Sequence, residues 1–206
     1  MYLFFDSETS GLPQDYNAPP SKGPNWPRLV TLAWLVTDAD GREIRHHHSV
    51  FMPLGWEIEP EAQAIHGYTT ERAREIGTYL WPVLSILERT IDDAQAILAH
   101  NYVFDRSVVG SEYLRLDRPD PFLPKLSFCT MRSTADILKL PGRRAGSYKW
   151  PRLSELHRFL FGKEHDGQHD ALADVRACKR CFFELRKRNL LPGIGSELTE
   201  PARIGR

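Results

Sequence analysis

The order of its apolar segments is the feature that most restricts the folds open to this chain. Leu3-Phe4-Phe5 is a short apolar run typical of a buried strand, and residues 29–36 predict a second strand. The turn sequence Asp38-Ala39-Asp40-Gly41 leads into a third strand at 43–52, which indicates a hairpin and antiparallel pairing. After this hairpin, helical segments alternate with short apolar runs, so we expect an α/β domain with a mixed sheet.

The rest of the chain supplies the helices and two more strands. Helices are expected at 59–65, 69–76, 80–92, 101–114, 130–138, 151–162 and 170–189. The apolar run at 96–99 predicts an internal parallel strand, and a further strand is expected near 126–128. Asn101 and Pro151 are expected to begin their helices, the first as a cap and the second as a first-turn proline. Residues 13–27 hold five prolines, which predict an irregular excursion.

Length and composition predict one soluble domain. A chain of 206 residues usually forms one domain with a sizeable core, here expected at 1–192, followed by a flexible tail at 193–206. No apolar run reaches membrane-spanning length, so we expect no membrane association. Three cysteines are too few for a disulfide framework, which favours a reducing, cytoplasmic setting. Cys178 and Cys181 fall in an expected helix without a second ligand pair, so we interpret them as packed thiols rather than a zinc site.

Acidic side chains stand at the ends of several expected elements. Asp6 and Glu8 are two residues apart at the end of the first strand, which puts both side chains on one face. Asp105 lies one turn inside a helix that follows an apolar strand. Asp174 borders the apolar stripe of the last helix and therefore needs a cation partner, and His169 stands just before that helix. The alternative for Asp6 and Glu8 is that they are solvated acids at an exposed strand end. The alternative for Asp105 is that it interacts favourably with the dipole at the start of its helix.

Four carboxylates and an imidazole that converge would form a centre for phosphoryl chemistry. Such acids remain ionised at close range only if cations neutralise them. Hard oxygen ligands favour Mg²⁺ or Mn²⁺, and a pair of these ions is a clamp for in-line phosphoryl displacement. A histidine is a natural base for the attacking water.

Four segments of the chain resemble motifs of the DEDDh-type, DnaQ-like 3′–5′ exonucleases, a family that includes the proofreading epsilon subunit of bacterial DNA polymerase III. In the family's order they are Asp6 to Leu12, Ile65 to Thr69, Ala99 to Asp105 and His169 to Asp174. Each motif alone is weak, whereas all four in order are specific. The resemblance implies a ribonuclease H-like fold, with three leading antiparallel strands, then parallel strands, and flanking helices.

The resemblance also implies roles for individual residues. Asp6, Glu8 and Asp174 would bind the first of two Mg²⁺ or Mn²⁺ ions, and Asp6 would bridge to the second. Asp105 would act through water on the metals, and His169 would be the general base. The residues implied to line the pocket of the 3′-terminal nucleotide are Thr9, Leu12, His66, Asn101 and Phe104.

A basic stretch provides local positive charge that could attract nucleic acid, which the overall charge of the chain does not provide. Lys+Arg and Asp+Glu both number 27, so the formal net charge is +0 and gives no general attraction to phosphates. Between residues 139 and 152 five basic residues occur without an acid, and Tyr148 and Trp150 lie among them. Arg143, Arg144 and Lys149 are therefore candidate strand-binding residues, with a solvated loop as the alternative.

Three functions are compatible with this sequence. The first is a 3′–5′ exonuclease that releases nucleoside 5′-monophosphates from single-stranded DNA ends, alone or in proofreading or repair. The second is an exoribonuclease of the same superfamily, because tolerance of the 2′-hydroxyl group cannot be read from sequence. The third is a non-catalytic interaction module, which the intact motifs disfavour. Association with a polymerase is suggested by analogy alone, since no binding segment for it is recognisable.

Overall fold

The computed structural model describes residues 1–123 and 125–191, so the tail predicted at 193–206 lies outside the described residues. Its centre is a five-stranded sheet in the order β3-β2-β1-β4-β5. The strands are β1 (Tyr2–Thr9), β2 (Leu29–Thr37), β3 (Glu43–Val50), β4 (Ala96–Ala99) and β5 (Ser127–Cys129). β2 pairs antiparallel with β1 and β3, whereas β4 runs parallel to β1 and β5. The mixed sheet and the hairpin that the sequence predicted are therefore confirmed.

The helices lie close to their predicted positions. They are α1 (Pro60–His66), α2 (Thr70–Ile76), α3 (Leu80–Asp93), α4 (Tyr102–Arg115), α5 (Thr130–Ser133), α6 (Ala135–Leu138), α7 (Leu153–Phe161) and α8 (Ala171–Lys187), with a short 3-10 helix, η1 (Gly23–Asn25).

Three local predictions were wrong. The helix expected over 130–138 is divided into α5 and α6 at Thr134, whose hydroxyl donates to the carbonyl of Thr130. Pro151 precedes α7 instead of opening it, because Arg152 is the N-cap and the Pro151 carbonyl accepts a bond from His100. Asn101 stands at the N-cap of α4 but makes no capping bond with its side chain, since its backbone is left-handed.

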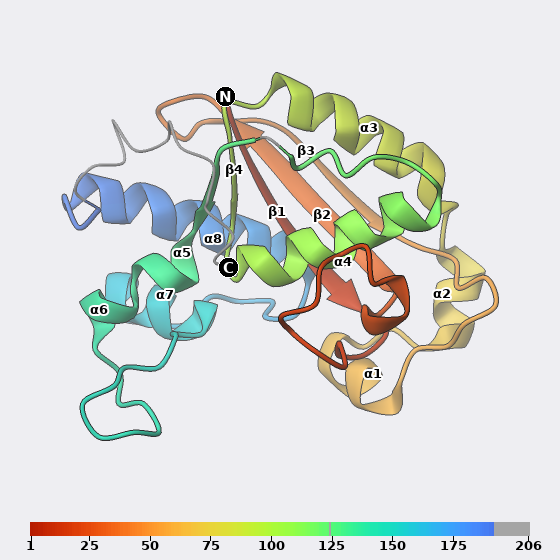
Figure 1. Cartoon of the computed structure of the whole chain (residues 1–206). Helices are drawn as coiled ribbons and strands as arrows, with labels where there is room; N and C mark the ends of the chain where they lie inside the picture. Colours follow the sequence, from red (N-terminus) through yellow and green to blue (C-terminus); the bar gives the residue numbers. More distant parts are fainter. Residues whose placement is uncertain (124, 192–206) are drawn as a thin grey trace.

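Two helical layers cover the sheet, and β1 contributes to both cores. Leu3 and Phe5 pack into the cluster beneath α3 and α4, whereas Tyr2 and Phe4 pack into the cluster beneath α8. This alternation is the two-residue period of a strand buried on both faces. Figure 1 shows α4 across one face of the sheet, α8 on the other, and α1 beyond the carboxyl end of β1. α7 packs on the far side of α8 through Leu156 and Leu160.

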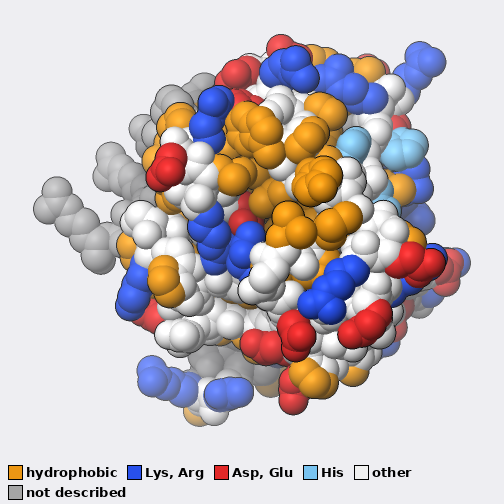
Figure 2. All heavy atoms as spheres, turned by 90° about the vertical axis from the view of Figure 1, so that its right-hand side faces the viewer, with side chains coloured by type: hydrophobic (Ala, Val, Ile, Leu, Met, Phe, Trp, Pro, Cys, Tyr) orange, Lys and Arg blue, Asp and Glu red, His pale blue; other side chains and the backbone are white. Residues whose placement is uncertain are grey.

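Apolar side chains also reach the surface of the α3 layer. Figure 2 shows them gathered on the face to the right in Figure 1, and exposed residues of α2, α3 and their flanks are Ile76, Tyr79, Trp81 and Ile86. No helix among the described residues is long and apolar enough to cross a membrane.

Candidate functional site

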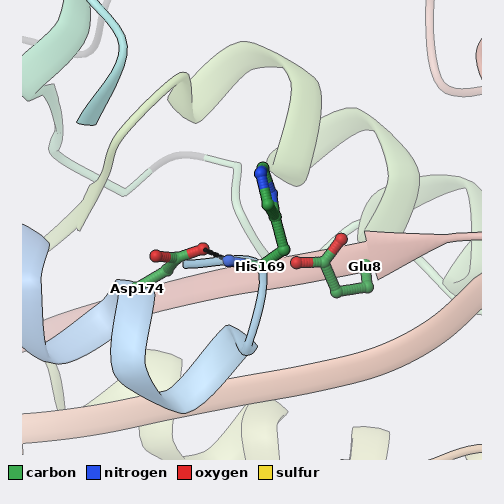
Figure 3. A group of neighbouring side chains, drawn as sticks. All are labelled: Glu8, His169 and Asp174. Carbon is green, nitrogen blue, oxygen red and sulfur yellow. Dashed lines mark hydrogen bonds between the residues drawn. The ribbon is translucent and has the colours of Figure 1, made fainter. Parts of the chain in front are cut away.

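The carboxyl end of β1 brings the predicted carboxylates and the histidine together. Glu8, His169 and Asp174 each offer one ligand atom, and these atoms lie within 4.8 Å of one another. Figure 3 shows the carboxylates of Glu8 and Asp174 on either side of His169. Asp6 lies on the same face of β1 as Glu8, because Ser7 separates the two residues. β1 and the start of α8 thus supply four of the five predicted groups.

Hydrogen bonds hold both oxygens of Asp174. Its Oδ2 accepts the backbone N–H of His169 at 3.0 Å, and its Oδ1 accepts Nε2–H of His165 at 2.5 Å. His169 has a φ of 67°, a left-handed conformation that costs energy for a residue with a Cβ. The next residue, Asp170, caps α8 by accepting the N–H of Ala173. The side chain of Asp174 is therefore held by the ring of His165 and by the backbone of His169.

Asp105 approaches from the opposite layer of the sheet. It lies in the first turn of α4, is 3% exposed, and accepts two bonds from Ser7. The Ser7 hydroxyl donates to Oδ1 at 2.7 Å, and the Ser7 N–H donates to the same atom at 3.2 Å. Since Ser7 points toward α4 while Asp6 and Glu8 point toward α8, the acids meet around the end of β1 rather than on one face of it.

Burial, together with the charges of neighbouring acids, raises the pKa values of these carboxyl groups. Burial, then the charges of Asp105, Asp174, Glu8 and Asp170, raise the pKa of Asp6 well above its usual range. Burial and the nearby acids raise the pKa of Glu8 to about 8. Burial also raises the pKa of Asp105 to about 7, although the bonds from Ser7 oppose the shift. A centre of this kind fits hard divalent cations, which neutralise clustered oxygen donors.

The residues predicted to line the nucleotide pocket surround the end of β1. Leu12 is 70% exposed, whereas Thr9 is buried and its hydroxyl donates to the carbonyl of Gly11. His66, the last residue of α1, places Nε2 3.3 Å from the carbonyl oxygen of Thr9. Burial lowers the pKa of His66, although the contact with the Thr9 carbonyl opposes this shift and His169 adds to it. The hydroxyl bond from Thr9 to Gly11 is a contact within the protein that the predicted role of Thr9 in nucleotide binding did not include.

Asn101 and Phe104 border the same region at the start of α4. Asn101 has a φ of 74°, which turns the chain from β4 into the helix. Phe104 is half-buried, with ring centroids of Tyr16 and Trp26 each 6.3 Å from its own. Tyr16 is 53% exposed and belongs to the proline-rich excursion.

A buried ion-pair network fixes this excursion against α4. Glu112 is buried and pairs with both Arg28 and Arg115. Arg115 also donates to the carbonyls of Gly23 and Trp26, at 2.7 and 2.6 Å. The excursion is thus an ordered wall beside Phe104.

The basic stretch is a small hairpin between α6 and α7. Pro141 and Tyr148 form its bridge, and Arg143 and Arg144 lie exposed at its tip. Lys149, also predicted to bind the strand, forms an ion pair with Glu155, with Nζ 2.5 Å from Oε1.

His100 connects this hairpin to the site. It follows β4, and its Nε2 donates to the carbonyl of Pro151 at 3.0 Å while Nδ1 accepts from the Thr130 hydroxyl at 2.9 Å. Burial lowers the pKa of His100 to about 4, which keeps the imidazole neutral and this bonding pattern stable. The bond to Pro151 thereby joins the base of the hairpin to His100, which directly precedes Asn101.

Three residues of this region were not predicted from the sequence. Ser7 lies between two acids of the first motif, but the motif does not indicate that it binds Asp105. His165 precedes His169 by four residues, outside the recognised motif, and Tyr16 lies in a segment without periodicity. Only spatial proximity identifies them.

Comparisons with known proteins identify the family of the chain. The profile of the RNase_T family, described as Exonuclease, matches residues 3–182. No curated protein sequence matches the chain significantly.

Solved structures share the fold. E. coli exonuclease I in complex with a dA16 oligonucleotide has a TM-score of 0.72 and 23% sequence identity, covering 92% of this chain and 41% of that one. The zinc-bound form of an E. coli exonuclease I complex with single-stranded DNA gives 0.70 and 24%, covering 92% and 41%. A product-bound structure of exonuclease I gives 0.71 and 23%, covering 92% and 44%. The chain spans about two fifths of the length of these structures.

Proposed function

The chain belongs to the RNase_T exonuclease family, and from this premise we propose that it removes nucleotides from the 3′ ends of single-stranded DNA. The products would be nucleoside 5′-monophosphates. The observation that carries the proposal is the meeting of Asp6, Glu8, Asp105 and Asp174 around the end of β1, with His169 within 4.8 Å of two of them. The structures of E. coli exonuclease I bound to dA16 and dT13 support DNA as the substrate.

The carboxylates would bind two Mg²⁺ or Mn²⁺ ions. Asp6, Glu8 and Asp174 would bind the first ion, and Asp6 and Asp105 would take part in binding the second. When bound, the ions supply positive charge that stabilises the phosphate during in-line displacement. The raised pKa values of Glu8 and Asp105 support this assignment, because burial and the nearby acids disfavour their charged forms and a bound cation would favour them.

His169 would act on the water that attacks the terminal phosphodiester. The water oxygen forms a bond to phosphorus, its proton passes to the imidazole, and the bond from phosphorus to the 3′ oxygen breaks. The leaving 3′ oxygen takes a proton from solvent. His169 suits this task because its ring is exposed while its backbone is fixed by the bond to Asp174.

The surrounding side chains would hold an unpaired strand. Leu12, Phe104 and Tyr16 present apolar and aromatic surface on which bases can stack, which requires the bases to be free of a complementary strand. Thr9, His66 and Asn101 would border the terminal nucleotide. Arg143 and Arg144 would attract phosphates farther along the strand, whereas the pairing of Lys149 with Glu155 reduces its part.

Digestion of labelled strands tests the proposal. DNA and RNA oligonucleotides labelled at the 5′ or the 3′ end would be incubated with the protein and Mg²⁺ or Mn²⁺, and Asp174→Asn would serve as the control. We expect 5′-labelled DNA to shorten one nucleotide at a time and 3′-labelled DNA to release a labelled mononucleotide at once. Faster digestion of RNA than of DNA would show that RNA is the preferred substrate. Intact strands in every reaction would overturn the proposal.

A further inference from the structure

The most unusual side chain near the site is one that the proposed roles do not use. His165 lies in the segment between α7 and α8, and its side chain is only 5% exposed. Nε2 lies 2.5 Å from Oδ1 of Asp174. Because a carboxylate oxygen only accepts, Nε2 carries the hydrogen atom of this bond.

The second ring nitrogen of His165 argues against a packing role alone. Nδ1 is buried and has no hydrogen-bond partner among residues 1–123 and 125–191. Burying an unpaired ring nitrogen costs stability, so a leucine or phenylalanine would fill this place better if only volume mattered. The nearest aromatic neighbour is His157, with ring centroids 5.6 Å apart, and that contact does not require an imidazole.

The segment around His165 is held so that the ring faces Asp174. His157 donates from Nδ1 to the carbonyl of Lys163 at 2.7 Å, and Gln168 donates to the carboxylate of Glu164 at 2.8 Å. Gly167 takes a left-handed turn with a φ of 73°, which brings the chain back toward α8. These contacts leave the imidazole of His165 directed into the protein, while His169 is exposed.

The two bonds to Asp174 have a consequence for its free lone pairs. Oδ1 accepts from His165 and Oδ2 accepts from the backbone of His169, so each oxygen uses one lone pair within the protein. A carboxylate oxygen has a second lone pair. Both remaining lone pairs are then held in one orientation beside Glu8, where a cation would bind.

We infer that His165 is a positioning residue that orients Asp174 for divalent-cation binding. The inference rests on the proposed function and adds to it a residue that does not touch the substrate. Outer partners of metal ligands fix the ligand's orientation, and their loss typically lowers metal affinity or activity by about 10- to 100-fold.

Mn²⁺ binding to the metal-free protein tests this inference without substrate. His165→Leu keeps the site apolar and filled but cannot donate, and His165→Gln keeps a donor at the end of a side chain of similar reach. Isothermal titration should show Mn²⁺ affinity lowered by about 10- to 100-fold in His165→Leu and largely restored in His165→Gln. At saturating Mn²⁺, kcat should fall in His165→Leu while the KM for the strand stays unchanged.

His47→Leu is the matched control, because it removes a partly buried imidazole that stacks on Trp34 and bonds to Ser49 on β3, away from Asp174 and the segment that holds His165. It should bind Mn²⁺ as the unaltered protein does. Equal loss of affinity in both leucine variants, or no loss in His165→Leu, would overturn the inference. Unaltered protein that binds Mn²⁺ but leaves strands intact would overturn the proposed function alone, whereas unaltered protein that binds no Mn²⁺ overturns both.

Discussion

The hydroxyl of Ser7 donates a 2.7 Å hydrogen bond to Oδ1 of Asp105 and so joins β1 to α4 across the boundary of two layers. Asp105 is buried, and a buried carboxylate is stable only when its oxygens have partners. Ser7 therefore fixes the one acid that does not come from the α8 side of the sheet.

Ser7→Ala should weaken both the fold and the activity. Loss of a hydrogen bond to a charged group costs about 1–3 kcal/mol. Burial raises the pKa of Asp105 to about 7 despite the bonds from Ser7, so removing the hydroxyl should raise that pKa further. Nuclease rates measured from pH 6 to 9 should then fall more at the acidic end. Ser7→Thr keeps a hydroxyl group and should retain the original profile, and an unchanged profile in Ser7→Ala would contradict this account.

Asp6→Asn should abolish turnover and stabilise the metal-free protein at alkaline pH. Unfolded carboxyl groups have pKa values of roughly 4, whereas burial and then neighbouring acids raise the folded-state pKa of Asp6 well above that value. Between these values the folded protein binds more protons than the unfolded chain, so this contribution to stability is lost as pH rises. Removing the charge of Asp6 lowers the repulsion.

Urea unfolding in EDTA at pH 5, 6, 7 and 8 measures this effect. The unfolding midpoint of Asp6→Asn minus that of the unaltered protein should increase with pH. Mn²⁺ at pH 8 should raise the midpoint of the unaltered protein more than that of the variant. A difference that stays constant over the whole range would show that the pKa of Asp6 is not raised in the folded state.

His169→Ala should lower kcat by about 10²- to 10⁴-fold, the usual contribution of a general base. Its backbone N–H would still bond to Asp174, so the fold should be kept. Single-turnover rates on a 5′-labelled strand measure the loss. His46→Ala, which removes an exposed histidine on β3, should leave the rate unchanged, and equal rates in both variants would exclude His169 as the base.

Tyr16→Ala should raise the KM for a DNA strand and leave kcat nearly unchanged. Stacking of one base on an aromatic ring contributes about 1–3 kcal/mol, which corresponds to roughly a 5- to 150-fold change in binding. Tyr79→Ala is a suitable control because Tyr79 is also exposed but lies on a flank of α3. Identical KM values for Tyr16→Ala and the unaltered protein would show that the excursion is not part of the strand-binding surface.

Arg143→Ala combined with Arg144→Ala should reduce the salt dependence of strand binding. Each lost phosphate contact lowers the slope of log affinity against log salt concentration by about 0.7 for single strands. Fluorescence anisotropy with a catalytically inactive Asp174→Asn background gives these slopes. Replacing Arg45 and Arg89, exposed residues of β3 and α3, should leave the slope unaltered, and a similar slope in both double variants would show that the hairpin tip does not bind phosphates.

The periodic parts of this protein were predictable, and the contacts between distant segments were not. The apolar run before Asp6 and the turn at Asp38 predicted the strands and their pairing because local spacing determines them. The break at Thr134 depends on a local bond that competes with regular helix geometry, so propensity alone missed it. Asn101 is the N-cap of α4 as predicted, but its left-handed backbone leaves its side chain without a capping bond.

The candidate site shows the same division. Glu8, Asp174 and His169 were found because motif spacing is preserved along the chain, and the structure places them together. His165 and Ser7 escaped because a hydrogen bond between segments leaves no periodic signal. The pairing of Lys149 with Glu155 likewise depends on how α7 follows the hairpin.

The approach of Asp105 from one layer and Asp174 from the other has a consequence for the protein's synthesis. β1, with two of the acids, leaves the ribosome first, while α8 follows more than 160 residues later. Until α8 docks, the emerging polypeptide lacks Asp174 and the histidine in front of it. Phosphodiester cleavage should therefore begin only once α8 is in place, so translation products that end before α8 should not cleave nearby nucleic acid.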